Sequence, residues 1–291
     1  MSPSNHALLR QSMPLARQWA QSLCHHVDKS GASCASFHEI WQILRYLDLN
    51  ASADAHDDFF LDHMAMAIGA GAKRVLISGA ADYAMLDAVR RAFLEAPVPP
   101  EVTVVDVCET PLRLCQWYAD KMDMQIAVQR SDILTFTDEN PFDLICTHAF
   151  LSYFDKAGRR ELAARWHSLL APGGRLMSVN RLRPSAPEEV SFTDVEARAF
   201  TDDVCQRLAK SDLASDVTLK DFTTLADRYI RTRFLYPVRS EAEIVALLTG
   251  TGFEMVYMTP DPMTCDQPGQ PSGPTLRGGA RYACFVARRP A

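Results

Sequence analysis

Between Lys73 and Asn180, short apolar runs alternate regularly with amphipathic helical patterns. The apolar runs are nearly continuous, which is typical of strands covered by helices on both faces. Such alternation implies right-handed crossovers between parallel strands. The pattern therefore predicts an α/β fold built on a mostly parallel sheet. The expected strands span 74–78, 102–107, 125–129, 142–147 and 175–180, and the helices between them span 83–95, 110–122 and 156–170.

The pattern resumes near the end of the chain, with a helix at 241–252 and strands at 253–258 and 281–287. No helical pattern separates these two strands, so we expect an antiparallel pair at the edge of the sheet. The stretch that joins them, 259–280, is rich in proline and glycine. A loop of this length is usually functional or disordered.

Residues 1–70 have a helical texture. The segment 40–49 places its apolar residues three and four apart, as on the buried face of an amphipathic helix. Ser36, with Glu39 three residues later, fits a capping box at the start of this helix. A second helix is expected to run to Ile68.

These two patterns, helical and then alternating strand and helix, divide the chain into a helical cap, 1–70, and an α/β domain, 71–291. Within the second part, residues 185–235 read as polar and helical and interrupt the alternation, so we expect a helical insert there.

The composition is that of a globular protein, with 47% hydrophobic residues, a net charge of -6 and no apolar run long enough to span a bilayer. The acidic balance argues against nucleic acid as a partner, and the N-terminus lacks the apolar core of a secretory signal. We therefore expect a cytoplasmic protein without a membrane partner. No CxxC pair occurs, so no metal site is expected and most cysteines are interpreted as small buried hydrophobes.

Ligands of open parallel sheets bind beyond the carboxyl ends of the strands. Gly79 follows the first strand and permits close approach of the backbone, and Asp82 stands where the next helix begins, so free N–H groups point toward a ligand. Asp82 is alternatively an ordinary N-cap. Asp106 ends the second strand and can accept both hydroxyls of a ribose, although a solvated strand-end carboxylate is the alternative.

The order of elements resembles the class I S-adenosylmethionine-dependent methyltransferases. The segment SLLAPGGRLMSVN (168–180) is similar to the family's helix–turn–strand signature before strand five. The first four family motifs correspond in position to VLISGAADY, VDVCETPL, SDILTF and PFDLICTHAFL. The resemblance covers residues 73–182 well and 240–287 by pattern. It implies a Rossmann-like, doubly wound sheet of seven strands with an antiparallel edge strand.

The resemblance also implies S-adenosyl-L-methionine as the cofactor. The first motif departs from the family, which has an acidic residue at Ile77 and glycines at Ala81 and Tyr83. Asp82 is a candidate to replace the missing carboxylate in holding the methionine ammonium. The cofactor-binding residues that follow from the motif positions are Ser78, Gly79, Ala81, Asp82, Asp106, Val107, Asp132 and Ile133.

A methyltransferase must hold nucleophile, methyl group and sulfur in line, and a general base helps when the nucleophile carries a proton. His148 ends the fourth strand and is the candidate base, with a role in the pocket wall as the alternative. Tyr153, Arg231 and Arg233 are candidates for binding the substrate, which the arginines would favour as an anion. The alternative for the arginine-rich run is a solvated face.

The predicted function is methyl transfer to a small molecule, with the accepting atom left open among oxygen, nitrogen, sulfur and carbon. The rival is a methyltransferase fold that does not methylate, either as a non-catalytic partner subunit or as an enzyme of other chemistry. The segment HDDFFLDHM (56–64) is interpreted as a polar helix face instead of a metal site. A homodimer formed through the cap is also expected.

Overall fold

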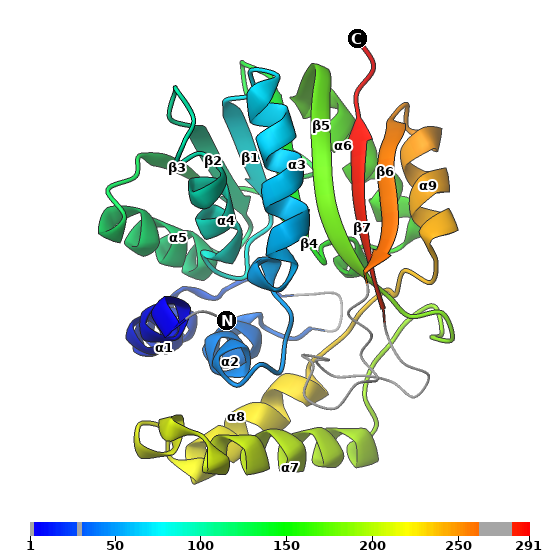
Figure 1. Ribbon diagram of the computed structural model, residues 1–291. Coiled ribbons are helices and arrows are strands. Elements are labelled where there is room, and N and C mark those ends of the chain that lie inside the picture. Colours follow the sequence, from blue (N-terminus) through cyan, green and yellow to red (C-terminus); the bar gives the residue numbers. More distant parts are fainter. Residues whose placement is uncertain (1–2, 28–30, 262–280) are drawn as a thin grey trace.

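The computed structural model describes residues 3–27, 31–261 and 281–291. A single sheet of seven strands forms its centre, in the order β3-β2-β1-β4-β5-β7-β6 (Figure 1). The strands are parallel except β7, which is antiparallel to both β5 and β6. The strands are β1 (Arg74–Ser78), β2 (Glu101–Asp106), β3 (Ile126–Arg130), β4 (Phe142–His148), β5 (Leu170–Leu182), β6 (Glu254–Asp261) and β7 (Arg281–Arg288).

This topology confirms the predicted fold class, including the antiparallel pair at the end of the chain. All seven strands lie where the apolar runs predict them. Two are longer than expected by more than one residue: β5 already begins at Leu170, which pairs with Phe142, and β6 continues to Asp261. The proline-rich and glycine-rich stretch, 262–280, lies outside the described residues.

Each face of the sheet is covered by its own set of helices. In β1, Val75 and Ile77 pack into a core with α3, α4 and α5, whereas Leu76 points to the opposite face and packs with α6 and α9. Successive strand residues face opposite sides, so both faces of β1 must be apolar. The covering helices are α3 (Asp57–Gly69), α4 (Ala84–Ala92), α5 (Glu109–Lys121), α6 (Lys156–Leu169) and α9 (Glu241–Gly250).

Four further helices lie beyond the carboxyl ends of the parallel strands (Figure 1). Two come from the N-terminal segment and two from the expected insert, and α2 packs against α8. The carboxyl ends of the strands therefore face these four helices, which we call the roof, instead of open solvent. These helices are α1 (Pro3–Leu23), α2 (Ala35–Tyr46), α7 (Asp194–Lys210) and α8 (Leu219–Arg231), with short 3-10 turns at Ala53–His56, Leu151–Tyr153 and Asp212–Ser215.

The capping box expected at Ser36 and Glu39 is wrong. Cys34 is the N-cap of α2 and Ser36 lies inside the helix. Partners on the insert explain the difference: Ser36 Oγ is 2.8 Å from Thr232 Oγ1, and Glu39 forms a 2.7 Å ion pair with Arg228. Tertiary contacts between α2 and α8 thus use the side chains that the local pattern assigned to a cap.

The helices of the described segments are too short or too polar to cross a membrane. The division into a cap and a main domain, the cytoplasmic location and the dimer formed through the cap stay predictions.

Candidate active site

A cavity of about 650 Å³ lies at the carboxyl ends of β1, β2, β3 and β4, between these ends and both α2 and the segment after α8. It brings together most of the site residues expected from the sequence. Within the described part of the chain, Ser78 and Arg231 are the two expected residues that do not line it. The expected residues that do are Gly79, Ala81, Asp82, Asp106, Val107, Asp132, Ile133, His148, Tyr153 and Arg233.

Gly79 makes the turn out of β1 toward the cavity. Its φ of +74° lies in the left-handed region, and a Cβ at this position would overlap the ring of Phe150. Its backbone N–H donates to the carbonyl oxygen of Val105 over 2.9 Å, which fixes the turn to β2. Glycine is therefore required here, both by the dihedral and by the approach of the aromatic ring. Ser78, just before it, is buried and accepts a hydrogen bond from Trp166 Nε1.

Asp106 is the last residue of β2, and its side chain lies between the turn after β1 and the turn after β2. Its carboxylate accepts hydrogen bonds from the backbone N–H groups of Ala80 (2.9 Å) and Cys108 (2.7 Å). Burial raises the pKa of Asp106 to about 6, although these two hydrogen bonds act in the opposite direction. A carboxylate has room for about four hydrogen bonds, so this one keeps acceptor capacity toward the cavity.

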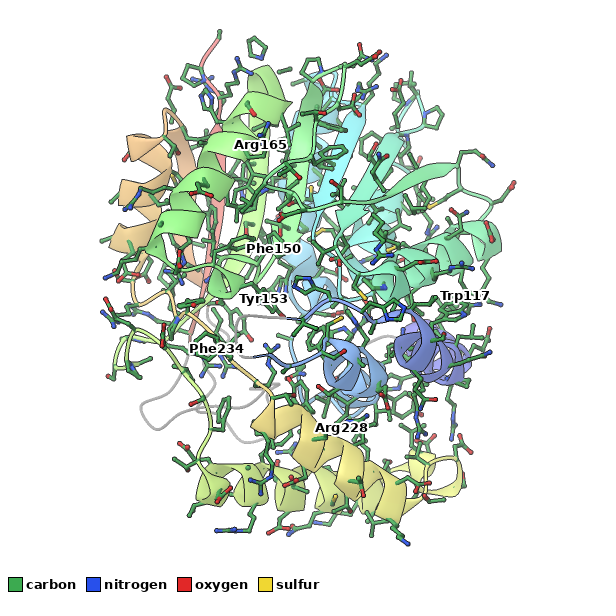
Figure 2. All side chains as sticks on the ribbon, turned by 180° about the vertical axis from the view of Figure 1, so that it is seen from behind. Trp117, Phe150, Tyr153, Arg165, Arg228 and Phe234 are labelled. Atoms are coloured by element: carbon green, nitrogen blue, oxygen red, sulfur yellow. The ribbon has the colours of Figure 1, made fainter. Side chains whose placement is uncertain are left out.

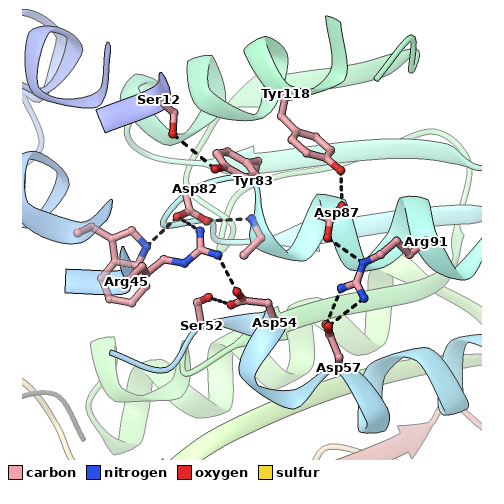
Figure 3. A network of polar contacts seen from close by, with 12 residues as sticks. Ser12, Arg45, Ser52, Asp54, Asp57, Asp82, Tyr83, Asp87, Arg91 and Tyr118 are labelled. Carbon is pink, nitrogen blue, oxygen red and sulfur yellow. Dashed lines mark hydrogen bonds and ion pairs between the residues drawn. The ribbon is translucent and has the colours of Figure 1, made fainter. Parts of the chain in front are cut away.

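Asp82 is already paired within the protein. Its carboxylate forms a buried ion pair with Arg45 and accepts hydrogen bonds from Trp41 Nε1 (3.1 Å) and the Ala84 backbone N–H (2.8 Å) (Figure 3). Only 2% of the Asp82 side chain is exposed. This geometry goes against the idea that Asp82 holds a ligand's ammonium, because its charge is balanced by the Arg45 guanidinium.

Arg45 also pairs with Asp54, in the 3-10 turn after α2, which lies 3.0 Å away and also accepts from the Ser52 hydroxyl. Burial alone would lower the pKa of Arg45, but Asp82 and Asp54 raise it above its usual value, so the side chain stays charged. The cation of Arg45 and the carboxylates of Asp54 and Asp82 are thus buried together beside the turn after β1.

Tyr83 occupies a position at which the resembled family has glycine, and it does not crowd the cavity. Its ring is buried and stacks on Tyr118 at 4.9 Å between centroids. The Tyr83 hydroxyl lies 3.5 Å from Ser12 Oγ (Figure 3). The side chain therefore extends the core toward α1, while Ala81 and the backbone of the turn remain at the cavity wall.

Asp132 and Ile133 form the cavity wall after β3. The Asp132 carboxylate accepts the Leu134 backbone N–H over 2.9 Å, and its side chain is exposed. Ile133 is buried and contributes an apolar surface. The part of the cavity at the ends of β2 and β3 therefore has one apolar face, from Ile133, and two carboxylates, from Asp106 and Asp132.

His148 is the last residue of β4 and lines the cavity. Its ring lies 5.1 Å from the ring of His56, which comes from the turn before α3 and does not line the cavity. The next residue, Ala149, has a φ of +53°, and its backbone N–H donates to Val179 on β5 over 2.7 Å. This sharp turn fixes the direction in which β4 ends.

Arg233 lies among aromatic rings on the roof side of the cavity. Its guanidinium carbon is 5.2 Å from the Phe37 ring centroid and 5.6 Å from those of Tyr153 and Tyr229. Figure 2 shows Tyr153 between Phe150, toward the sheet, and Phe234, toward α8. The roof side is therefore aromatic, with one guanidinium group placed among the rings.

Arg231 has a different environment. It forms exposed ion pairs with Asp227 and Asp194 on the outer side of the insert, so the structure gives it a surface role. Arg231 is the last residue of α8 and Arg233 lies two residues beyond, past the end of the helix, which explains why the two arginines do not share a face.

Four side chains that could hold a metal ion gather at the edge of the cavity, where the sequence predicts small buried cysteines and no metal site. In the segments the structure describes, they form the one group of three or more side chains arranged to hold a metal, and HDDFFLDHM contributes none of them. The Cys34–His38 spacing, one helical turn, is the local signal that sequence analysis missed. We call this group the thiol–imidazole cluster; it consists of Cys24, Cys34, His38 and Cys108.

Comparisons with known proteins agree with this architecture. Residues 84–174 match the family model of a methyltransferase domain. No curated protein matches the sequence. One similar solved structure is the N-methyltransferase NodS from Bradyrhizobium japonicum WM9 in complex with S-adenosyl-L-homocysteine, with 17% identity, a TM-score of 0.50, and coverage of 84% of this chain and 91% of that one.

A second similar structure is a putative sarcosine dimethylglycine methyltransferase from Galdieria sulphuraria. It has 10% identity and a TM-score of 0.55, with 88% of this chain and 98% of that chain covered. At these identities the structural likeness concerns the fold, and it extends beyond the segment that the family model matches.

Proposed function

We propose that this chain, whose residues 84–174 match the family model of a methyltransferase domain, is a class I S-adenosylmethionine-dependent methyltransferase that transfers a methyl group to a small molecule bound in the cavity described above. The observation that carries the proposal is the joining of two unlike halves in one cavity. One half is formed by the turns after β1, β2 and β3, where this family binds its cofactor. The other half is the aromatic roof around Arg233.

In the cofactor half, Asp106 is the acceptor for the ribose hydroxyls, because it ends β2 and its carboxylate faces the cavity with unused lone pairs. Ile133 provides an apolar surface for the adenine, and Asp132 can accept from its exocyclic amino group. Gly79 and Ala81 allow the backbone to approach the methionine part. With Asp82 paired to Arg45, backbone groups of this turn take over the binding that a free carboxylate would provide.

In the acceptor half, the rings of Phe37 and Tyr153 suit a flat or apolar substrate body, and Arg233 suits an anionic group on it. The cofactor, when bound, supplies an already activated methyl group, so the protein's main task is alignment of the accepting atom. His148 stands at the wall between the halves, where its imidazole can take the proton that the accepting atom loses.

The roof supports methyl transfer in a second way. Side chains of α2 and of the segment after α8 cover the carboxyl ends of the strands, which keeps water away from the reacting atoms. A covered cavity can exclude water only when the bound acceptor is small enough to fit inside it. The cavity therefore suits a small-molecule acceptor better than a macromolecule. A small molecule, anionic where it meets Arg233, is therefore the substrate class we propose.

The test is calorimetric titration of the purified, cofactor-free protein with S-adenosyl-L-homocysteine, followed by a screen of small acceptors for release of that product. We expect binding at micromolar concentrations and product release with a subset of anionic or aromatic acceptors. A folded protein that does not bind would contradict the proposal and favour the rival interpretation, a scaffold that acts with another protein.

A further inference from the structure

We infer that the thiol–imidazole cluster is a binding site for one zinc ion, which joins the N-terminal helices to the turn after β2. Its four side chains come from three separate places in the fold. Cys24 follows α1, Cys34 and His38 lie at the start of α2, and Cys108 lies between β2 and α5. Their ligand atoms all lie within 4.8 Å of one another.

The distances fit a tetrahedral zinc site. With zinc–sulfur bonds of about 2.3 Å, sulfur atoms at the corners of a tetrahedron are about 3.8 Å apart. Cys108 Sγ lies 3.3 Å from Cys24 Sγ and 3.6 Å from Cys34 Sγ. His38 Nδ1 lies 3.2 Å from Cys24 Sγ and 3.5 Å from Cys108 Sγ. The sulfur separations are far longer than a disulfide bond of about 2.0 Å.

The chemistry of the set also selects zinc. Three thiolates and one neutral imidazole form a standard ligand set of structural zinc sites and suit hard cations such as magnesium or calcium poorly. On binding, the three thiols release their protons to solvent and the sulfurs donate electron pairs to Zn²⁺. His38 binds through Nδ1 and keeps its proton on Nε2.

Two of the thiols lie where the fold favours a negative charge. Cys34 is the N-cap of α2 and Cys108 is the N-cap of α5, and in both cases the side chain makes no capping hydrogen bond. The positive ends of two helix dipoles therefore point toward the cluster, which stabilises thiolates there. Thr110 Oγ1, 3.2 Å from Cys24 Sγ, adds a hydroxyl that can donate to the third sulfur.

The site is closed by protein but reachable. Cys24, His38 and Cys108 are at least nine-tenths buried, whereas Cys34 is half-buried. Cys34, His38 and Cys108 also line the cavity, which provides a path for the metal. Because four protein ligands complete a tetrahedron, the ion serves structure and leaves no position for a reacting water.

The site also connects to the cofactor half of the cavity. The backbone N–H of Cys108 donates to the Asp106 carboxylate, so a metal that fixes Cys108 also fixes Asp106. Zinc would thus fix the position of the N-terminal helices relative to Asp106, the proposed acceptor for the ribose hydroxyls. This consequence, unlike the site itself, rests on the proposed function.

The experiment is elemental analysis of full-length protein purified without a polyhistidine tag. We expect one zinc atom per chain, and loss of that zinc in Cys24→Ser and His38→Gln. Cys205→Ser, which changes a cysteine of α7 outside the cluster, is the matched control and should keep the metal. Cobalt substitution should give the intense visible absorption of a tetrahedral site and a thiolate-to-cobalt charge-transfer band.

A second measurement keeps the test valid if the variants fail to fold. Wild-type protein is treated with a chelator, and ZnCl2 is then added back while circular dichroism and melting temperature are followed. We expect a lower melting temperature after chelation and its recovery with ZnCl2. Protein without stoichiometric metal that neither binds nor responds to ZnCl2, iron in place of zinc, or a disulfide between cluster cysteines would each overturn the inference.

The outcomes also separate this inference from the proposed function. Protein that contains zinc but does not bind S-adenosyl-L-homocysteine would contradict only the proposed function. Protein that binds S-adenosyl-L-homocysteine but holds no zinc would contradict only the metal site.

Discussion

At the scale of single residues, Asp106 accepts two backbone N–H groups, and we propose that it also accepts the hydroxyls of the cofactor ribose. We expect Asp106→Asn to weaken S-adenosyl-L-homocysteine binding about 10-fold to 100-fold, because hydrogen bonds to a charged group contribute about 1.5–3 kcal/mol. Titration calorimetry of folded protein measures this loss.

Asp143 provides the matched control for Asp106. It also accepts two backbone N–H groups, from Lys73 and Arg74 at 2.9 Å each, but at the opposite end of the sheet. Asp143→Asn should therefore lower stability and leave binding unchanged. Equal affinities of Asp106→Asn and the wild-type protein would remove the ribose assignment.

His148 is expected to act on the reaction and not on cofactor affinity. Loss of a general base typically costs a factor of about 10²–10⁴ in rate, so we expect His148→Gln to lower turnover within that range while the affinity for S-adenosyl-L-homocysteine stays near that of the wild type. His167→Gln is the control, since His167 packs against Phe253 on the far side of α6. Turnover of His148→Gln equal to that of the wild type would end the base hypothesis.

Gly79 is expected to tolerate no side chain. An L-residue in the left-handed region costs about 1–2 kcal/mol, and a Cβ at Gly79 would also displace the Phe150 ring. Gly79→Ala should therefore lower both the free energy of unfolding and the affinity for S-adenosyl-L-homocysteine. Gly250→Ala, in α9 with open space around it and no positive φ, should change neither property unfavourably. A Gly79→Ala variant with wild-type affinity would show that the turn is not part of the site.

At the scale of elements, the buried ion pair between α2 and the turn after β1 is the contact most sensitive to change. Arg45→Met leaves two buried carboxylates, Asp82 and Asp54, without their cation, and breaking a buried pair in this way costs about 3–5 kcal/mol. Urea unfolding monitors the loss. Arg231→Met, which removes exposed ion pairs, is the control and should cost at most about 1 kcal/mol. Similar costs for both variants would contradict the structural role of the buried pair.

The elements themselves could largely be predicted from the sequence, because strands and helices follow from apolar periodicity that is local in the chain. Side-chain partners could not. Arg45 and Asp82 are 37 positions apart, and Cys24 and Cys108 are 84 apart, so no local pattern joins them. The failed capping box at Ser36 has the same cause, because its hydroxyl meets Thr232 instead of its own helix.

The residues of the candidate site also fall into two groups: those that the sequence could place and those that it could not. Residues at strand ends, such as Gly79, Asp106 and His148, could be placed because the carboxyl ends of parallel strands meet at one edge of the sheet. Residues contributed by the roof, such as Phe37 and Trp41, could not be placed, because their position depends on how the helices pack over that edge. The sequence offers Arg231 as a candidate for substrate binding, with a solvated face as the alternative, and the side chain lies outside the cavity in exposed ion pairs.

At the scale of the whole molecule, the cavity is complete only because the N-terminal helices meet the insert above the sheet. The hydroxyl of Thr232 contacts Ser36 on α2, and Thr232 itself lines the cavity. We expect Thr232→Val to raise the KM for the acceptor about fivefold, in line with about 1 kcal/mol for a hydrogen bond. S-adenosyl-L-homocysteine affinity should stay unchanged, because the residues expected to bind the cofactor lie at the strand ends.

Thr223→Val is the control for this change. Thr223 lies on α8, the helix that Thr232 directly follows, but its hydroxyl contacts Leu219 and Cys205, away from the cavity. The variant should keep the KM of the wild type. If Thr232→Val instead weakened both ligands equally, the roof would be a general stabiliser of the fold. A change confined to the acceptor would mean that the contact between α2 and α8 sets how firmly the cavity closes over its substrate.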